Sequence, residues 1–296
     1  MIWATQRNTE LGQPVARFYE PAEGVPCERQ AMMIGGLPGA DKPSALARAG
    51  VDPSRYVTVS VNAELLEMAA RGLIPRVDGL SPLEAADLAH GEAQFLVKRI
   101  AMRALADGPN LLFDISMASV HAVEPWLDRL KLAGYATRGI FAEISIEEAV
   151  RRSAAEYRLG QEEYRNGRGF GGRYVPPEAI RAPANAAGSP EAWTAPASSD
   201  GGSGGLLGVA ATGGAADMIA SYLSGQLTLE DLASEFRAQR WRAAPQATPP
   251  GLEKAAPAID DPEPYVPGSF DDVVLAYDLG QLCDADYEAL ARAATG

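Results

Sequence analysis

The sequence predicts an α/β fold, in which a parallel sheet flanked by helices is followed by a linker and two short helical hairpins. Strand and helix signals alternate over residues 31–182, which is typical of β-α-β units. A glycine-rich segment, Gly35–Ser44, follows the first apolar run. It approaches the pattern G-x-x-x-x-G-K-[ST], in which backbone N–H groups hold phosphates, lysine neutralises them and a hydroxyl holds Mg²⁺. The predicted sheet is therefore of the P-loop NTPase type.

The strands are expected in four places. Ala31–Ile34 predicts a buried strand, and Ser44–Ala49 predicts the helix after the glycine-rich loop. Tyr56–Val61 is rich in β-branched residues and predicts a second strand. Apolar runs at Asn110–Phe113 and Thr137–Ile144 predict two more.

Capping signals mark the start of two helices. Ser81-x-x-Glu84 has the pattern of a capping box, with proline directly after the cap, and predicts a helix that runs to Asp107. Its shared face would carry Leu88, Phe95 and Met102. Ser145-x-x-Glu148 predicts a helix that ends near Gly160, and Glu124–Ala133 predicts another.

Composition divides the chain into six parts. A linker is predicted where Ala, Pro, Ser and Gly dominate, and a second where prolines recur. The parts are an N-terminal arm (1–30), the α/β domain (31–182), a linker (183–206), a helical hairpin (207–244), a Pro-rich linker (245–268) and a second hairpin (269–296).

The two hairpins are copies of one pattern. Ile219–Asp231 reads [IV]-x-x-Y-x-x-G-Q-L-x-x-x-D, and the same pattern recurs at Val274–Asp286. Each copy predicts a helix, a tight Gly-Gln-Leu turn and a second helix. A hairpin of this size buries little surface alone, so the two are expected to dock on each other, on the α/β domain or on a partner protein. Simple C-terminal packing elements are an equally good alternative.

Charge and cysteine content exclude several classes of function. The 296 residues carry a net charge of −13, which argues against a general nucleic-acid-binding protein. We expect no membrane partner either, because no stretch has the length and apolarity of a membrane span or a signal peptide. Cys27 and Cys283 are far apart, which fits a reducing compartment such as the cytoplasm. With two histidines and two cysteines, we expect no structural metal site.

A series of short segments carries a family resemblance. The segments are GGLPGA at 35–40 with Lys42, YVTV at 56–59, ARGLIP at 70–75, LSPLEAADLAHGE at 80–92, NLLFDISMAS at 110–119, LAGY at 132–135, IFAEISIEEAVRR at 140–152 and GGRYVPPEAI at 171–180. In this order and spacing they resemble the zeta toxin family of P-loop kinases, which phosphorylate the 3′-hydroxyl of UDP-N-acetylglucosamine sugars. The resemblance implies ATP and Mg²⁺ as cofactors, a UDP-sugar as acceptor and a toxin–antitoxin context.

The resemblance also implies roles for individual residues. Those of the phosphate-binding loop are Gly36, Gly39, Lys42 and Ser44. Those at the catalytic positions are Asn62, Arg158 and Arg173, and those at the acceptor site are His90, Glu92 and Asp114. Two alternatives stay open from the residues themselves. Lys42 could equally be a solvated surface lysine, and a buried core position for His90 is favoured over a catalytic one.

Two letters of the loop depart from the working pattern. Asp41 stands in place of the last glycine, where its carboxylate would face a polyanion unless it pairs with Lys42 or points outward. Pro43 stands in place of the Ser/Thr, so one N–H and the Mg²⁺-binding hydroxyl are lost. Ser44 is the next residue, but one step along a helix is a rotation of about 100°. The loop is expected to bind nucleotide poorly.

Two catalytic positions depart as well. Asn62 and Ala63 stand where the family has the aspartate that accepts the proton of the sugar hydroxyl, and Glu64 lies beside that position. Glu156 stands where the family has a lid arginine. An amide is not basic, and a carboxylate repels the transferred phosphoryl group. We therefore expect an inactive or strongly impaired kinase that serves as a scaffold or interaction module; the alternative is an active UDP-sugar kinase with a reshaped ATP site.

Overall fold

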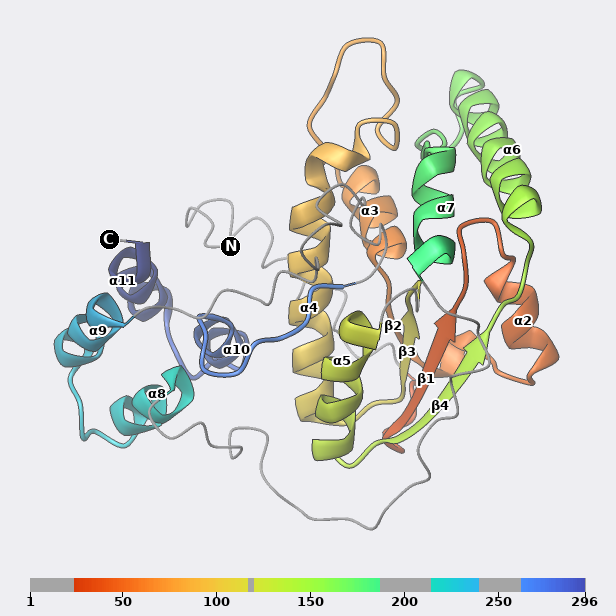
Figure 1. The fold of residues 1–296 in the computed structure, drawn as a ribbon. Coiled ribbons are helices and arrows are strands. Elements are labelled where there is room, and N and C mark those ends of the chain that lie inside the picture. Colours follow the sequence, from red (N-terminus) through yellow and green to blue (C-terminus); the bar gives the residue numbers. More distant parts are fainter. Residues whose placement is uncertain (1–23, 117–119, 187–213, 240–261, 296) are drawn as a thin grey trace.

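Four parallel strands form one sheet in the order β2-β3-β1-β4 (Figure 1), which confirms the predicted parallel sheet. The strands are β1 (Gln30–Gly35), β2 (Val57–Val59), β3 (Leu111–Asp114) and β4 (Ala136–Phe141). Ile34 of β1 pairs with Asp114 on one side and Ile140 on the other. The loops after β1 and β3 therefore begin side by side, at the edge where open α/β sheets bind ligands.

This computed structural model describes residues 24–116, 120–186, 214–239 and 262–295. Residues 1–23 of the predicted N-terminal arm and residues 187–206 and 245–261 of the two predicted linkers lie outside these ranges. In the described part of the chain, no helix is both long and apolar enough to cross a membrane.

Helices cover both faces of the sheet, as predicted, and further helices follow in the C-terminal part. Those of the α/β domain are α2 (Lys42–Arg48), α3 (Val61–Ala70), α4 (His90–Asp107), α5 (Val120–Leu132), α6 (Ile146–Arg165) and α7 (Pro177–Ala186). Those of the C-terminal part are α8 (Ala215–Leu223), α9 (Leu229–Ala238), α10 (Asp271–Asp278) and α11 (Asp284–Thr295). Short 3₁₀ turns, η1 (Pro53–Arg55) and η2 (Ala86–Ala89), precede β2 and α4.

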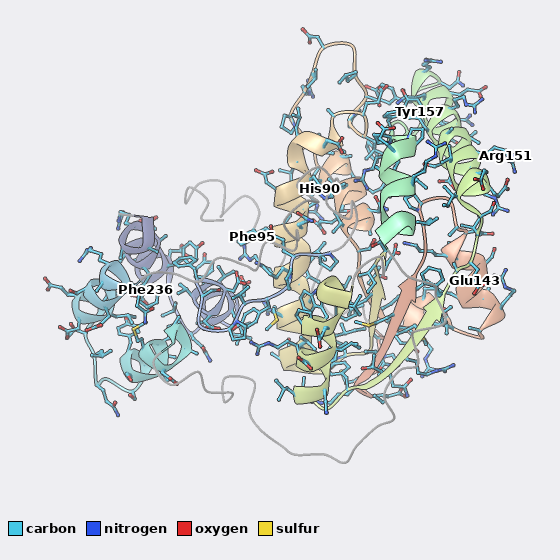
Figure 2. All side chains as sticks on the ribbon, viewed as in Figure 1. His90, Phe95, Glu143, Arg151, Tyr157 and Phe236 are labelled. Carbon is cyan, nitrogen blue, oxygen red and sulfur yellow. The ribbon has the colours of Figure 1, made fainter. Side chains whose placement is uncertain are left out.

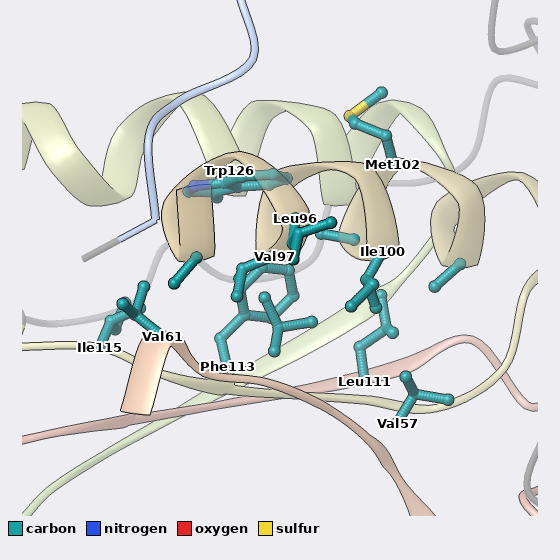
Figure 3. Packing of buried hydrophobic residues seen from close by; sticks show 14 of the residues in the cluster. Val57, Val61, Leu96, Val97, Ile100, Met102, Leu111, Phe113, Ile115 and Trp126 are labelled. Carbon is teal, nitrogen blue, oxygen red and sulfur yellow. The ribbon is translucent and has the colours of Figure 1, made fainter. Parts of the chain in front are cut away.

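The alternation of side chains along β1 builds two apolar layers. Met33 packs with the buried side chains of α3, α4 and α5, whereas Met32 and Ile34 pack with those of α2. In the larger layer, the Phe113 ring lies 5.4 Å from that of Trp126, beneath α4 (Figure 3). Both rings are at most 1 % exposed, so the sheet and α5 are fixed relative to each other.

The predicted helix from Ser81 to Asp107 is wrong at its start. The Ser81–Glu84 cap forms, with Ser81 N donating to the Glu84 carboxylate at 2.9 Å. However, α6 also binds both cap residues: Tyr157 Oη donates to Glu84 and Gln161 Nε2 donates to Ser81 Oγ. The turn is thus held against α6, and the chain passes through η2 before α4 begins at His90. Leu88 is 64 % exposed and does not share a helix face with Phe95 and Met102.

Three other boundaries differ from the prediction. β2 ends before Ser60, because the Ser60 side chain caps α3 by accepting from Ala63 N. β4 ends at Phe141 rather than Ile144. The helix that begins after the Ser145 cap runs to Arg165 and does not end near Gly160. A Cβ at Gly160 would lie 2.7 Å from Gly172 Cα, so this glycine permits a close crossing inside the helix rather than ending it.

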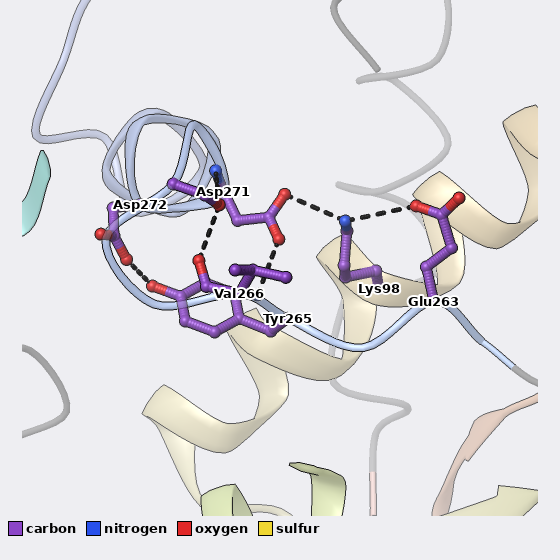
Figure 4. Close-up of polar contacts among 7 residues, drawn as sticks. Lys98, Glu263, Tyr265, Val266, Asp271 and Asp272 are labelled. Carbon is purple, nitrogen blue, oxygen red and sulfur yellow. Dashed lines mark hydrogen bonds and ion pairs between the residues drawn. The ribbon is translucent and has the colours of Figure 1, made fainter. Parts of the chain in front are cut away.

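The C-terminal helices dock on each other and on α4. Two of the three expected arrangements, docking on each other and docking on the α/β domain, are therefore present together. Their shared apolar core includes Phe236 of α9 and also Phe95 of α4 (Figure 2). On α4, Lys98 Nζ lies 2.9 Å from an Asp271 oxygen and 3.5 Å from Glu263 (Figure 4). Arg99, the next residue of α4, pairs with Asp278. An apolar contact and these ion pairs, of which Arg99–Asp278 is buried, therefore attach α10 to the α/β domain.

Candidate functional site

The glycine-rich loop after β1 lies tightly against β4 and α6. Gly36 and Gly39 have φ angles of +145° and +80°, which other residues rarely adopt. A Cβ at Gly36 would lie 2.8 Å from the Ala142 carbonyl oxygen, and a Cβ at Gly39 would lie 2.8 Å from that of Ala149. Both positions require glycine because the neighbouring backbone is so close.

Asp41 stands where the loop pattern has its last glycine, and it forms the N-cap of α2. Its backbone is left-handed, with φ 51° and ψ 53°, as expected for a glycine position. Its carboxylate accepts a hydrogen bond from Ser44 N at 3.3 Å, and bonding to the Ser44 side chain and backbone lowers the pKa of Asp41. The carboxylate thus bonds to Ser44 and not to Lys42. Pro43 occupies the first turn of α2.

Lys42 and Asp114 form an ion pair at the switch point of the sheet. Lys42 Nζ lies 2.7 Å from Asp114 Oδ1, and Ser60 Oγ donates to Asp114 Oδ2 at 3.2 Å. The Lys42 side chain is 15 % exposed, so Lys42 is not the solvated surface lysine of the alternative interpretation. The segments that follow β1 and β2 and the end of β3 therefore each contribute one member of a polar cluster.

The structure brings one of the two predicted arginines to this edge. Arg173 Nη1 donates a hydrogen bond to Asn62 Oδ1, in the first turn of α3. Arg158 is exposed and its Nε donates to Ala154 O of its own helix. Glu156 lies two residues before Arg158 on α6; desolvation raises its pKa, while Arg152 lowers it and Asp41 raises it. Asp41 and Glu156 are therefore close enough for their charges to interact.

His90 and Glu92 lie in the first turn of α4, at the end of the sheet where the strands terminate (Figure 2). Both are half-buried, and both ring nitrogens of His90 are buried from solvent. The assignments of His90 and Glu92 to an acceptor site, like the other site assignments, remain predictions.

Glu64 is an ionisable residue whose burial the sequence analysis did not predict. It is 3 % exposed, and its Oε1 atom is buried without a hydrogen-bond partner among the described residues. Burial raises its pKa to about 8; nearby Glu67 adds to the shift and Arg71 opposes it. The signal was its spacing from Val61 and Met68, which places all three on the core-facing side of α3.

Replacing Glu64 should change how stability depends on pH. The pKa of this carboxyl is about 8 in the folded protein against 4.5 ordinarily, so the folded state binds the extra proton between these values. Stability should therefore fall as pH rises from 4.5 to 8. Glu64→Gln should lose most of this slope and gain about 1–3 kcal/mol at pH 8.5. Urea unfolding at several pH values measures both.

The matched control is Glu67→Gln, one turn further along α3, where an exposed ion pair with Arg71 is removed instead. Because the Glu67 charge adds to the shift of the Glu64 pKa, the slope of this control should be slightly smaller than that of the unaltered protein but far larger than that of Glu64→Gln. Equal slopes for Glu64→Gln and the unaltered protein would show that Glu64 is already ionised at neutral pH.

The loop does not fit a nucleoside triphosphate and its Mg²⁺. Pro38 and Pro43 have no N–H, Ala40 N donates to Leu37 O, and Ser44 N donates to Asp41. The residue where the pattern puts the Mg²⁺-binding hydroxyl is a proline. Two backbone donors and the metal-binding hydroxyl of the pattern are thus missing, and two further N–H groups are already bonded within the loop.

Comparison with known families places these features in context. The model of the zeta toxin family matches residues 26–190, which is more than half of the 296 residues. None of the curated proteins matches the chain.

Proposed function

We propose that this chain, which belongs to the zeta toxin family, is a kinase-like protein with absent or strongly impaired phosphoryl transfer that acts as a scaffold or interaction module. Members of the family generally depend on ATP and Mg²⁺, and the family is associated with nucleotide-sugar substrates and antitoxin partners. The α/β domain keeps the fold of such a kinase. The residues at its predicted catalytic positions are the reason to expect impaired phosphoryl transfer.

The hydrogen bond between Arg173 and Asn62 is the observation that carries the proposal. Phosphoryl transfer to a hydroxyl needs a group that accepts the hydroxyl proton, and the neutral amide of Asn62 has no such basicity. Loss of a general base alone typically costs about 10²–10⁴ in rate. The arginine that could stabilise the transferred phosphoryl group is bound to this amide instead.

The lid helix α6 supports the same conclusion. Arg158 is bonded to its own helix, and Glu156 brings negative charge toward Asp41. Phosphoryl transfer is promoted by positive charge at the developing transition state, so an acidic residue here acts against it.

The C-terminal helices supply the interaction part of the proposal. They form a core of their own and are joined to α4 by ion pairs, which leaves the outer sides of α9 and α11 facing solvent. We propose that these sides contact a protein partner. The exposed thiols of Cys27 and Cys283 support a cytoplasmic setting.

An active UDP-N-acetylglucosamine kinase is the second candidate. The observation that favours it is the cluster of Lys42, Asp114 and Ser60, which keeps a cation and a carboxylate where the loops after β1 and β3 meet.

The deciding experiment incubates the full chain with ATP, Mg²⁺ and UDP-N-acetylglucosamine and analyses the sugar nucleotide by mass spectrometry. We expect no phosphorylated product. Calorimetry with Mg²⁺-ATP gives a second measurement, in which the combined variant Asp41→Gly, Pro43→Ser and Asn62→Asp should bind more tightly than the unaltered chain. Phosphorylated UDP-N-acetylglucosamine from the unaltered chain would refute the proposal. The binding part of the proposal would be refuted if the unaltered chain bound Mg²⁺-ATP with a dissociation constant below roughly 50 µM and Lys42→Ala abolished this binding.

A further inference from the structure

We propose that Asp41 inhibits its own phosphate-binding loop, because its carboxylate occupies the Ser44 N–H and places a negative charge where a bound phosphate would lie. This inference rests on the proposed function, since it concerns the same loop. The new element is that one side chain, that of Asp41, closes the loop. Replacing this side chain should therefore restore phosphate binding.

The geometry at Asp41 shows how the carboxylate closes the loop. The left-handed backbone turns the side chain back over the first turn of α2, where it accepts from Ser44 N at 3.3 Å. The Ser44 hydroxyl, Arg48 and Arg152 are near enough to lower the pKa of the Asp41 carboxyl and so favour its negative charge. A hydrogen bond and nearby positive charge therefore both favour this position of the carboxylate.

Neither Pro43 nor the Lys42 ammonium replaces the Ser44 N–H as a donor to a phosphate. Pro43 has no N–H, and the Lys42 ammonium is bonded to Asp114 and to the Ile115 carbonyl oxygen. A phosphate would have to displace the Asp41 carboxylate from Ser44 and then lie beside it. At about 5 Å and an effective dielectric constant of about 20, one such like-charge contact weakens binding by roughly 100-fold.

The test uses inorganic tripolyphosphate as the probe, so that neither a base nor an acceptor sugar is needed. Asp41→Asn is the main variant and tests the charge alone, because asparagine tolerates a left-handed backbone and can still accept from Ser44 N as a helix cap. Asp41→Gly is the second variant and removes the side chain altogether. Asp52→Asn is the matched control: Asp52 is also an exposed cap whose carboxylate accepts from a serine N–H, but it lies beyond α2, at η1.

Calorimetry with tripolyphosphate and Mg²⁺ should show binding to both Asp41 variants at least about 30-fold tighter than to the unaltered chain or to Asp52→Asn. Thermal unfolding without the probe shows that each variant is folded. The inference is overturned if both folded Asp41 variants bind no better than the unaltered chain, or if the unaltered chain binds as tightly as they do.

These outcomes are separate from the test of the proposed function. Tighter binding by the Asp41 variants with no sugar product would support both proposals. Unchanged binding with no product would overturn only the role of Asp41. Product formation by the unaltered chain would overturn the proposed function, whatever the tripolyphosphate measurement shows.

Discussion

Asp278→Asn is expected to lower the free energy of unfolding by about 3–5 kcal/mol, because it leaves Arg99 buried without its counter-charge. The Arg99 side chain is 2 % exposed and that of Asp278 is 4 % exposed. Arg99 Nε lies 2.9 Å from Asp278 Oδ2, and Arg103 donates to the Asp278 carbonyl oxygen at 3.2 Å. Asparagine keeps the volume of the side chain, so the loss reports charge and hydrogen bonding rather than a cavity.

Urea unfolding followed by both circular dichroism and tryptophan fluorescence measures this loss. The control is Glu288→Gln, which removes the partner of Arg292; because the Arg292 side chain is 74 % exposed, the change should be under about 0.5 kcal/mol. The double variant Arg99→Met with Asp278→Leu should recover part of the loss, since an apolar pair needs no desolvation of charge. A loss below about 1 kcal/mol for Asp278→Asn would mean that water reaches Arg99 and that α10 is not firmly docked.

Gly172→Ala should cost about 3 kcal/mol or more, since the added methyl group has no space. A Cβ at this position would lie 2.2 Å from the Tyr157 carbonyl oxygen and 2.7 Å from Tyr157 Cα. These are backbone atoms of α6 and cannot rotate away. The segment that carries Arg173 would have to move off the helix, so the Arg173–Asn62 hydrogen bond should be lost as well.

Thermal and urea unfolding of Gly172→Ala measure the loss of stability, and amide hydrogen exchange in α6 shows where it occurs. Gly139→Ala in β4 is the control, because a Cβ there meets nothing within 4 Å. It should be neutral or slightly stabilising. If Gly172→Ala is as mild as the control, the 171–172 segment does not pack against α6 as closely as described.

The sequence predicted the sheet well because its signals are local. Short runs of apolar and β-branched residues mark the strands, and the Ser145 cap begins α6 where it was expected. The start of α4 could not be predicted, because the Ser81–Glu84 turn is held by Tyr157 and Gln161 of another helix. Gly160 misled the prediction of the end of α6 for the same reason: its small size serves a contact with Gly172.

The site was predictable as a set of residues but not as a set of contacts. The motifs predicted that Lys42 and Asp114 both belong to the site, and the structure shows an ion pair between them. The left-handed backbone of Asp41 follows from its place in the loop pattern, whereas its bond to Ser44 depends on how α2 begins. The bond of Arg158 to Ala154 of its own helix could likewise not be predicted from motif spacing.

The ion pair of Arg99 with Asp278 also bears on how the chain folds as it is made. The two residues are 179 positions apart. At a synthesis rate of about 5–20 residues per second, α4 exists for roughly 10–35 s before α10 has been made. During that time Phe95 of α4 lies uncovered beside Lys98 and Arg99. Two cations on this face of α4 should keep it hydrated and repel the same face of another nascent chain, so we expect the residues that later bind α10 to oppose aggregation while the protein is unfinished.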